Sequence, residues 1–520
     1  MTVRLTRREA LRLGGGAALA LPLLPLASAC GSSTGSTGSM VSSGAKLPRP
    51  FAVPLPVPQV LQPTQRDATT DYYEVVQRAA SVEILPGLRT EVWGYNGTFP
   101  GPTIEARSGR RVVVRHHNQL PVPTVVHLHG GVTPPDSDGY PTDLILPAEG
   151  AADVAQVKRN ADNPAWSFQT EAKDYAYPLD QRAATLWYHD HRMDFTGPQV
   201  YRGLAGFFVV RDAEEDSLPL PKGEREIPLL ICDRAFGSDG SFHYPALDPS
   251  LKNRPGVTNQ FMEGVLGDVI LVNGAPWPFL EVAAARYRFR ILNASNARRY
   301  RLALDPPPKH GSPFVQIGSD QGLLAQPVAQ QAIEIAQAER FDVVVDFSAY
   351  PTGTKVTLTN EFDSGSTGRV MRFHVTHSAG DESTVPPRLS EGVEELSRSA
   401  ATATRTFDFD RSNGMWMIDG QPFDPARMDA RPKLEATEIW RLSTDQHHPI
   451  HLHLVHFQVL TRNRGKPGPY DAGWKDVIDL SNGDEAEIIA RFSGYRGRYV
   501  FHCHNLEHED MAMMGNFQVV

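Results

Sequence analysis

A stretch near the end of the chain, residues 499–513, constrains the fold more than any other part of the sequence. It reads YVFHCHNLEHEDMAM, so a cysteine lies between two histidines, and a further histidine and a methionine follow. Side chains alternate between the two faces of an extended strand, so His502 and His504 should point one way and Cys503 the other. One short strand can therefore contribute to two separate metal sites.

The residue types in this stretch match one kind of metal site. Cys503, His508 and Met513 offer a thiolate, an imidazole and a thioether. This is the ligand set of a blue copper electron-transfer site that still lacks one histidine. The alternative is a core cysteine beside surface histidines, but five soft ligands within a dozen residues favour copper.

Composition favours a β-rich fold of several domains. The chain has 520 residues, enough for about three domains of roughly 100–200 residues each. Its 43 Gly and 42 Pro, with recurring alternating runs rich in valine, indicate many strands and turns. We predict an all-β chain with domains at residues 67–212, 225–378 and 406–520, and an interdomain linker at residues 379–405.

The beginning of the chain has the features of an export signal. Arg7 and Arg8 form a twin arginine, and the apolar run after them is too short and too rich in Gly and Pro for a membrane span. Residues 1–30 are therefore predicted to direct export by the twin-arginine route. We expect the mature protein to be periplasmic, anchored to the cell surface by a lipid, or secreted.

The end of this signal leaves two alternatives open. The residues before Cys30 fit either plain signal cleavage or a lipoprotein box, in which Cys30 would carry a lipid anchor. Residues 31–66 are predicted to form a Ser/Gly- and Pro-rich tether. Its first part, to residue 44, has the composition of a flexible linker, which favours the lipid anchor.

Net charge limits the classes of partner. The chain carries a formal charge of −9. Residues 1–30 hold four arginines and one glutamate, a charge of +3, so the chain without them would carry −12. A protein this acidic is a poor candidate for binding nucleic acid or an anionic membrane through charge. We expect a monomer that binds no nucleic acid.

Three further stretches place histidines at ligand spacing. In chain order the histidines are His127 and His129, His189 and His191, and His448, His451 and His453. Either His-X-His pair of the first domain would be weak evidence alone, but two pairs in one domain strengthen each other. His447 competes with His448 as a ligand, and Pro449 favours His448 because it fixes the relation of His448 to the histidines that follow.

Ten of the 18 histidines thus fall in four clusters, two toward each end of the predicted folded chain. A single copper ion cannot use ten imidazoles. A blue copper site would take His448, Cys503 and His508, with Met513 as a weak axial ligand. The remaining eight histidines form four pairs, which suit a group of three copper ions between the first and last domains.

In this order the four motifs resemble the signature of the multicopper oxidases, over about residues 70–520. The stretches HLHG at 127–130, WYHDH at 187–191 and HCHNLEHE at 502–509 are most similar to the bacterial spore-coat laccase and bilirubin oxidase branch. The resemblance implies three cupredoxin-like Greek-key β-sandwich domains, of which the middle one holds no copper. It also implies four copper ions in each chain, one of type 1, one of type 2 and two of type 3.

The resemblance assigns ligand roles by motif position. It implies that the type 1 copper is bound by His448, Cys503, His508 and Met513. Met513 is preferred to Met511 and Met514 because it lies five residues after His508. The type 2 pair would be His127 and His451. The six type 3 ligands would be His129, His189, His191, His453, His502 and His504.

The implied activity is the one-electron oxidation of phenols, aromatic amines or bilirubin-like donors, coupled to the reduction of O2 to water. Electrons would arrive through the edge of His508 and leave through Cys503 toward its two neighbouring histidines. Asp138 and Glu509 resemble acids that deliver protons in the spore-coat branch. The alternative for both is a solvated loop carboxylate.

Two other functions are open from the sequence. A metal oxidase acting on Cu(I) or Mn(II) would share the copper sites, but the chain has only 11 Met and no Met-rich cluster outside residues 511–514. A copper electron carrier without catalysis would need only the type 1 ligands. Such a carrier would leave eight histidines without a role.

Overall fold

The computed structural model of the chain describes residues 35–520, and most of its regular structure is β-strand. The predicted signal at residues 1–30 and the predicted anchor Cys30 lie outside the described residues. Among the helices of residues 35–520, none has both the length and the apolar character needed to cross a bilayer.

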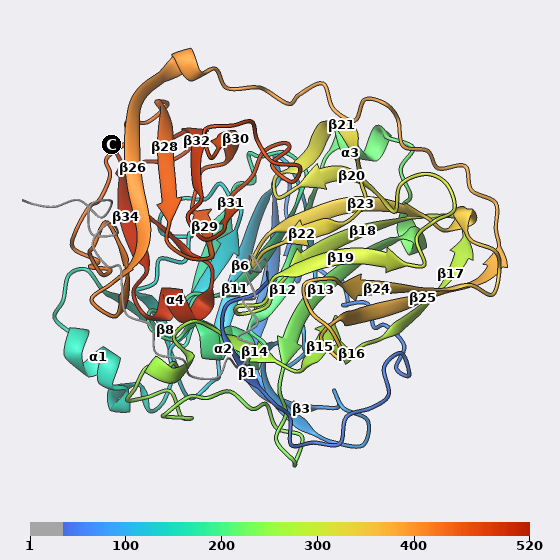
Figure 1. The fold of residues 1–520 in the computed structure, drawn as a ribbon. Coiled ribbons are helices and arrows are strands. Elements are labelled where there is room, and N and C mark those ends of the chain that lie inside the picture. The colour runs from blue at the N-terminus through green and yellow to red at the C-terminus, as the bar shows by residue number, and fades with distance from the viewer. Residues whose placement is uncertain (1–34) are drawn as a thin grey trace, which may run out of the picture. The chain divides into compact units, whose positions relative to one another are not determined.

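Strands from the first part of the chain form two sheets that share one apolar core. Figure 1 labels β3 and β6 of one sheet and β11 and β12 of the other. One sheet has the order β10-β6-β3-β2, with β4 paired to β3, and the other has the order β5-β12-β11-β7. Burial alternates along β6, as expected for a strand with one face on a core. The strands are β2 (Gln65–Arg66), β3 (Thr70–Val82), β4 (Thr90–Tyr95), β5 (Ile104–Arg107), β6 (Arg111–Asn118), β7 (Val126–His129), β10 (Ala172–Tyr177), β11 (Ala184–Asp190) and β12 (Ala205–Arg211).

The middle part of the chain forms a seven-stranded and a five-stranded sheet around a second core. Their orders are β16-β15-β13-β18-β23-β20-β21 and β17-β25-β24-β19-β22. The strands are β13 (Glu226–Arg234), β15 (Val269–Val272), β16 (Ala275–Pro276), β17 (Phe279–Ala284), β18 (Arg286–Asn293), β19 (Tyr300–Asp305), β20 (Phe314–Ser319), β21 (Gly322–Gln330), β22 (Ile333–Ile335), β23 (Arg340–Asp346), β24 (Lys355–Asn360) and β25 (Arg369–Ser378).

The last part of the chain forms a third pair of sheets, with orders β27-β26-β28-β32-β30 and β31-β29-β33-β34. They enclose a core that includes Cys503 and Met513. The strands are β26 (Ala401–Ser412), β27 (Met415–Ile418), β28 (Thr437–Thr444), β29 (His448–Leu452), β30 (Phe457–Arg462), β31 (Val477–Leu480), β32 (Glu485–Arg491), β33 (Gly497–Cys503) and β34 (Met514–Val519).

The same parallel pairing recurs in all three pairs of sheets. β3 pairs in parallel with β6, β13 with β18, and β26 with β28. Parallel neighbours cannot be joined by a tight hairpin, so other strands or loops must carry the chain back between them. The recurrence indicates three sandwiches built on one plan.

Short elements fill the connections between these sheets. The α-helices are α1 (Ala155–Asn160), α2 (Thr196–Arg202), α3 (Ala213–Ser217) and α4 (Leu506–Asp510). The 3-10 turns are η1 (Ala151–Asp153), η2 (Gly223–Arg225), η3 (Asn259–Phe261), η4 (Phe347–Ala349) and η5 (Arg398–Ala400). Two small strand pairs, β1 (Ser39–Val41) with β14 (Val265–Gly267) and β8 (Asp143–Leu146) with β9 (Ser167–Thr170), complete the set.

Strands begin within both the predicted tether and the predicted interdomain linker. β1 lies within the predicted flexible tether, yet it pairs in parallel with β14, and Ser43 donates from its backbone N to Asp268 at 2.8 Å. Residues 39–43 of the tether therefore pack on the middle part of the chain through a strand pair and a hydrogen bond. Similarly, β26 begins at Ala401 inside the predicted linker, whose Leu389 is buried. Figure 1 shows this linker, in orange tones, as an extended connection between β25 and β26.

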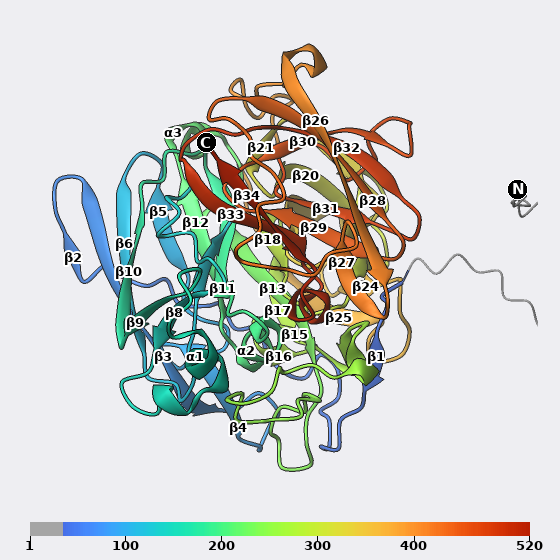
Figure 2. The same ribbon diagram turned by 90° about the vertical axis from the view of Figure 1, so that its left-hand side faces the viewer.

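The three sandwiches meet around the strands that carry the histidines. In Figure 2 the first sandwich is blue to green-cyan and the last orange to red. Tyr499 of β33 donates to the carbonyl of Thr133 at 2.9 Å, which joins the last sandwich to the first. Arg340 of β23 contacts Asp476, just before β31, which joins the middle sandwich to the last. Side chains far apart in sequence are thus held at one junction.

Candidate metal centre

Two pairs of neighbouring strands place most of the histidines. β7 and β11 are antiparallel, with His127 opposite His189. β29 and β33 are antiparallel, with His451 opposite His502. Residues opposite each other on adjacent strands have Cβ atoms about 5 Å apart, so each pair of strands gathers its own imidazoles. The contact between the two strand pairs then brings all of them together.

Cys503 points away from its two histidine neighbours, as the alternation along the strand predicts. Its Sγ lies 3.4 Å from Nδ1 of His448 and 3.5 Å from Nδ1 of His508. Those two nitrogens lie 3.0 Å apart. Nε2 of His448 donates to Asp445. Nδ1 of His448 therefore carries a lone pair, which is directed at the thiol. All three residues are buried, and together they form one of the groups able to hold a metal ion.

The structure also distinguishes between the alternative ligands of the site around Cys503. His447 contacts Asp479 through its Nε2 and does not join the group around Cys503. Met513 lies in the same apolar core as Cys503. Met514 faces another cluster, with Tyr140, so the neighbouring side chains of 513 and 514 point to opposite sides.

A second group consists of His191, His453 and His502. Nε2 of His502 lies 3.2 Å from Nε2 of His191 and 3.3 Å from Nε2 of His453. Nδ1 of His502 donates to the carbonyl of Cys503, so Nε2 carries no proton. Nδ1 of His453 lies 2.8 Å from Oδ2 of Asp138, so Asp138 occupies Nδ1 and leaves Nε2 for the group. Three ring nitrogens thus converge on one point.

A third group consists of His129, His189 and His504, and all three are buried. Nδ1 of His189 donates to the carbonyl of Asp190 at 2.8 Å, whereas its Nε2 has no partner. Within residues 35–520, Nδ1 of His129 and both ring nitrogens of His504 also lack partners. A buried nitrogen without a hydrogen bond costs about 1–3 kcal/mol, so a cluster of them requires an explanation such as a bound ion.

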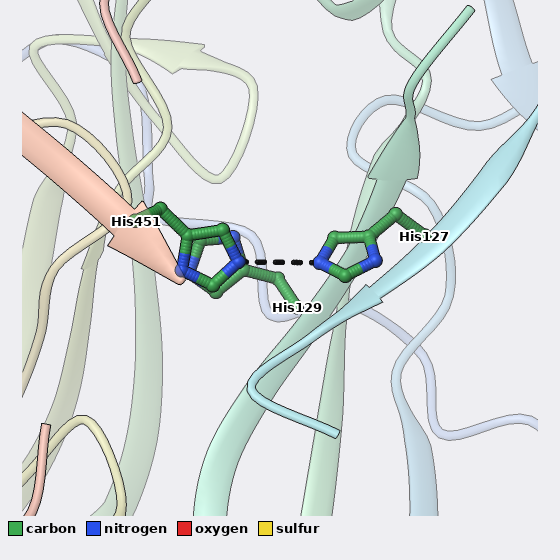
Figure 3. Close-up of side chains that lie close together, drawn as sticks. All are labelled: His127, His129 and His451. Atoms are coloured by element: carbon green, nitrogen blue, oxygen red, sulfur yellow. Dashed lines mark hydrogen bonds between the residues drawn. The ribbon is translucent and has the colours of Figure 1, made fainter. Parts of the chain in front are cut away.

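His127 and His451 face each other between these groups (Figure 3). Their Nε2 atoms are 3.3 Å apart. Nδ1 of His127 donates to the carbonyl of Asp138 at 2.6 Å, and Nδ1 of His451 to the carbonyl of Asp476 at 2.8 Å. Both Nε2 atoms are therefore lone pairs, which repel at this distance unless a cation lies between them. Figure 3 also shows the ring of His129 stacked on that of His451.

Burial gives these imidazoles the protonation state that metal ligands need. The pKa values of His127, His129, His451, His453, His504 and His508 are lowered well below the usual value, first of all by burial. Burial also lowers the pKa of His189 to about 3. Neutral imidazoles bind soft and borderline metal ions, and imidazole with thiolate suits copper. The donor set therefore fits copper.

Both predicted acids lie against this cluster. Asp138 is fully buried, and burial raises its pKa well above the usual value. Glu509 accepts from Oγ1 of Thr196 at 2.7 Å and lies 3.2 Å from Nδ1 of His502. Burial alone would raise the pKa of Glu509, but His191 and His502 lower it to about 2. The alternative of solvated loop carboxylates is wrong for both, because neither side chain reaches solvent.

The His508 ring is not exposed, which adds a step to the predicted route for electrons. The indole of Trp416 stacks on it, with ring centres 4.0 Å apart. Nε1 of Trp416 donates to the carbonyl of Met262 at 2.7 Å, which fixes the indole in place. Nε2 at the edge of the His508 ring lies 3.2 Å from Nδ2 of Asn505, so a donor outside the protein has no direct contact with the ring.

Several residues at the site were missed from the sequence. Trp187 stacks on His189, and Asp476 lies 2.9 Å from His129. Trp187 stands inside a histidine motif, so the alternation along its strand was a signal that could have found it. Asp476 belongs to no histidine motif, and nothing in its local pattern marks it.

The comparisons with known proteins agree with this geometry. Two family profiles, both described as multicopper oxidase, match residues 77–215 and 396–520. The chain is 38% identical to a laccase of Bacillus subtilis (strain 168), over 89% of this chain and 97% of that protein. It is 35% identical to a bilirubin oxidase of Albifimbria verrucaria, over 90% of this chain and 81% of that protein.

Solved structures give the same result for the fold. The crystal structure of a laccase from Pediococcus acidilactici matches with a TM-score of 0.79 and 31% identity, covering 92% of this chain and 96% of that chain. The predicted all-β, cupredoxin-like fold is confirmed by this likeness. On the combined evidence of its profiles, its relatives and its fold, this chain belongs to the multicopper oxidase family.

Proposed function

We propose that this protein is a laccase-like oxidase that takes single electrons from phenols, aromatic amines or bilirubin-like pigments and passes them to O2. The observation that carries the proposal is the position of Cys503. Its thiol belongs to one group of metal-binding side chains, and both of its chain neighbours belong to the others. An isolated electron carrier would have no use for the eight further histidines.

Copper when bound would supply one-electron redox chemistry at the Cys503 position and four-electron reduction of O2 at the shared histidine cluster. The chain offers His448, Cys503 and His508, with Met513, as ligands of the first position. The His127 and His451 pair would hold a second ion. The two remaining groups, His129, His189 and His504, and His191, His453 and His502, would hold one ion each.

The backbone around Cys503 supplies a short covalent connection between the two sites. Cys503 is bonded through peptide units to His502 and His504, and its own carbonyl accepts from Nδ1 of His502 at 3.0 Å. These bonds hold the two sites in a fixed relation. The route requires no movement of the chain.

The acids beside the cluster would manage protons. Oε1 of Glu509 is held by Thr196, and its carboxylate lies between His191 and His502. Oδ2 of Asp138 lies against Nδ1 of His453 on another side of the cluster. Because O2 reduction to water consumes protons, Asp138, whose pKa burial raises, can hold a proton close to where it is needed, and the ionised Glu509 can accept a proton and pass it on.

A comparison of electron donors tests the function. The copper-loaded protein is supplied in turn with a phenol, an aromatic amine dye, bilirubin, Cu(I) and Mn(II), while O2 uptake is followed. We expect O2 consumption with the organic donors. His453→Ala should abolish it, whereas His374→Ala, in a strand of the middle sandwich outside every metal-binding group, should not. A fully loaded protein that consumes O2 only with Cu(I) or Mn(II) would support the metal oxidase instead.

Export and anchoring are a separate proposal that rests on the twin arginine and on the residues before Cys30. Expression of the full-length chain with Cys30→Ala, followed by cell fractionation, tests it. A lipid-anchored protein should move from the membrane to the soluble exported fraction, while a plainly cleaved one should be soluble with either residue.

A further inference from the structure

The copper-free middle sandwich contributes one side chain that reaches toward the histidine cluster. Arg340, at the start of β23, is fully buried and lies against Asp476 of the last sandwich, which is also fully buried. Nη1 donates to Oδ1 of Asp476 at 2.7 Å and Nη2 to Oδ2 at 2.5 Å. This two-pronged contact fixes the plane of the carboxylate as well as its charge.

The remaining donors of Arg340 are used to hold the guanidinium itself. Nε donates to the carbonyl of Thr185 in β11 at 2.9 Å. Nη1 also donates to the carbonyl of Ala338, and Nη2 to that of Asp320. The guanidinium is therefore bound by all three sandwiches, and it cannot turn without breaking contacts in each of them.

Asp476 in turn sets the proton positions of two stacked histidines. Its Oδ1 lies 2.9 Å from Nε2 of His129, and an ionised carboxylate only accepts. Nε2 of His129 must then carry the proton, which leaves Nδ1 as a lone pair. The backbone carbonyl of Asp476 accepts from Nδ1 of His451, which leaves Nε2 of that ring as the lone pair.

The two rings therefore need opposite proton positions although they lie almost parallel. Their centres are 3.6 Å apart and their planes differ by 15°. Asp476 occupies Nε2 of His129, which leaves Nδ1 for the group with His189 and His504, while Nε2 of His451 is directed at His127. A proton on the wrong nitrogen of either ring would block one metal position.

We propose that Arg340 is a positioning residue for copper binding, because it holds Asp476 so that His129 binds through Nδ1 and His451 through Nε2. The inference rests on the proposed function, since it takes copper as the occupant of the cluster. The middle sandwich would thus take part in the metal site although it supplies none of the metal ligands. Removing partners of this kind lowers metal affinity by about 10–100-fold.

The test compares Arg340→Lys and Asp476→Asn with the parent protein. Lysine keeps the charge but cannot hold both carboxylate oxygens. In Asp476→Asn, the amide oxygen should take the Oδ2 position, where both Arg340 and Gln321 donate. The NH2 group then meets Nε2 of His129 as a second donor, which favours the other tautomer. We expect about 10–100-fold weaker copper binding at the histidine cluster in both variants, measured by competition with a chelator. The type 2 copper signal in electron paramagnetic resonance should change as well.

The matched control is Arg288→Lys. Arg288 is equally buried and holds Asp342 and Glu215, but it touches none of the histidines. The Arg288→Lys variant should have a lower free energy of unfolding than the parent but the same type 2 copper signal. The blue absorption of the Cys503 site is an internal control and should persist in every variant.

Three outcomes separate the possibilities. The positioning role is overturned if both variants, Arg340→Lys and Asp476→Asn, bind copper with an affinity within twofold of that of the parent protein and show the same type 2 copper signal as the parent. If Arg340→Lys does not fold, parent-like copper affinity and an unchanged type 2 signal in Asp476→Asn alone overturn the positioning role. A parent protein that binds no copper at the histidine cluster would instead contradict the proposed function itself.

Discussion

At the scale of single residues, Cys503 shows how one side chain separates two metal positions. The strand directs it toward His448 and His508, while the residues on either side of it enter other groups. Burial raises the pKa of its thiol well above the usual value, so without a metal ion the sulfur would keep its proton. A bound cation reverses this preference, because a coordinating thiol is deprotonated.

Replacement of Cys503 by serine should remove the blue absorption. A hydroxyl does not provide the thiolate on which this copper site depends. We expect donor oxidation to fall by more than the roughly 100-fold typical of losing an outer partner of a metal ligand. Cys232→Ser is the control, because Cys232 is equally buried in β13 but lies in no metal-binding group. Blue absorption that survives in Cys503→Ser would contradict the assignment.

Met513→Leu should raise the reduction potential of the type 1 copper, because it replaces a weak thioether ligand by an apolar group. A redox titration of the blue absorption measures the shift. Met514→Leu makes the same change on the opposite side, in a cluster with Tyr140, and should leave the potential unchanged. Equal potentials in Met513→Leu and the parent would exclude Met513 as a ligand.

At the scale of elements, buried charges join α3, which follows the first sandwich, to β13 and β18 of the middle one. Arg288 and Arg290 of β18 contact Glu215 of α3 and Glu226 of β13. Burial alone would raise the pKa of Glu226, but Arg290 and Arg288 lower it to about 2. The network holds β18 beside β23, the strand that carries Arg340.

Glu226→Gln should lower the free energy of unfolding by about 3 kcal/mol near pH 7, because it leaves buried arginines short of a counter-charge. An unfolded glutamate titrates near pH 4.3. The folded pKa lies lower, so the stabilisation is present above about pH 4 and is lost as the pH falls toward 2. Urea unfolding of variant and parent should therefore converge over this range. Glu485→Gln, at an exposed pair with Arg464, should cost less than about 1 kcal/mol.

At the scale of the whole molecule, the histidine cluster connects the two ends of the fold. His127, His129, His189 and His191 come from the first sandwich and the other members from the last. Ions shared between them would cross-link segments more than 300 residues apart, as the sequence separation of 324 between His127 and His451 illustrates. Such ions bind the folded state more tightly than the unfolded chain, because only the fold brings the ligands together.

Removal of copper by a chelator should lower the thermal unfolding midpoint reversibly. An ion present at 100 times its dissociation constant stabilises the folded state by about 2.7 kcal/mol, and several ions add to this. Scanning calorimetry of loaded, stripped and reloaded protein measures the effect. Cys503→Ser should retain most of the shift, because the histidine cluster remains. Equal midpoints in loaded and stripped protein would show that the cluster binds no structural copper.

The sequence alone determined the β-rich class of the fold, the four histidine motifs and the division of residues 502–504 between two faces. These features depend on neighbours in the chain, and the alternation of a strand is local stereochemistry. The structure decided what depends on distant residues. It buried His508 beneath Trp416, paired β1 with β14, and placed Arg340 against Asp476, which lies 136 residues away. Such contacts follow from how separate sheets pack, and no local pattern records that packing.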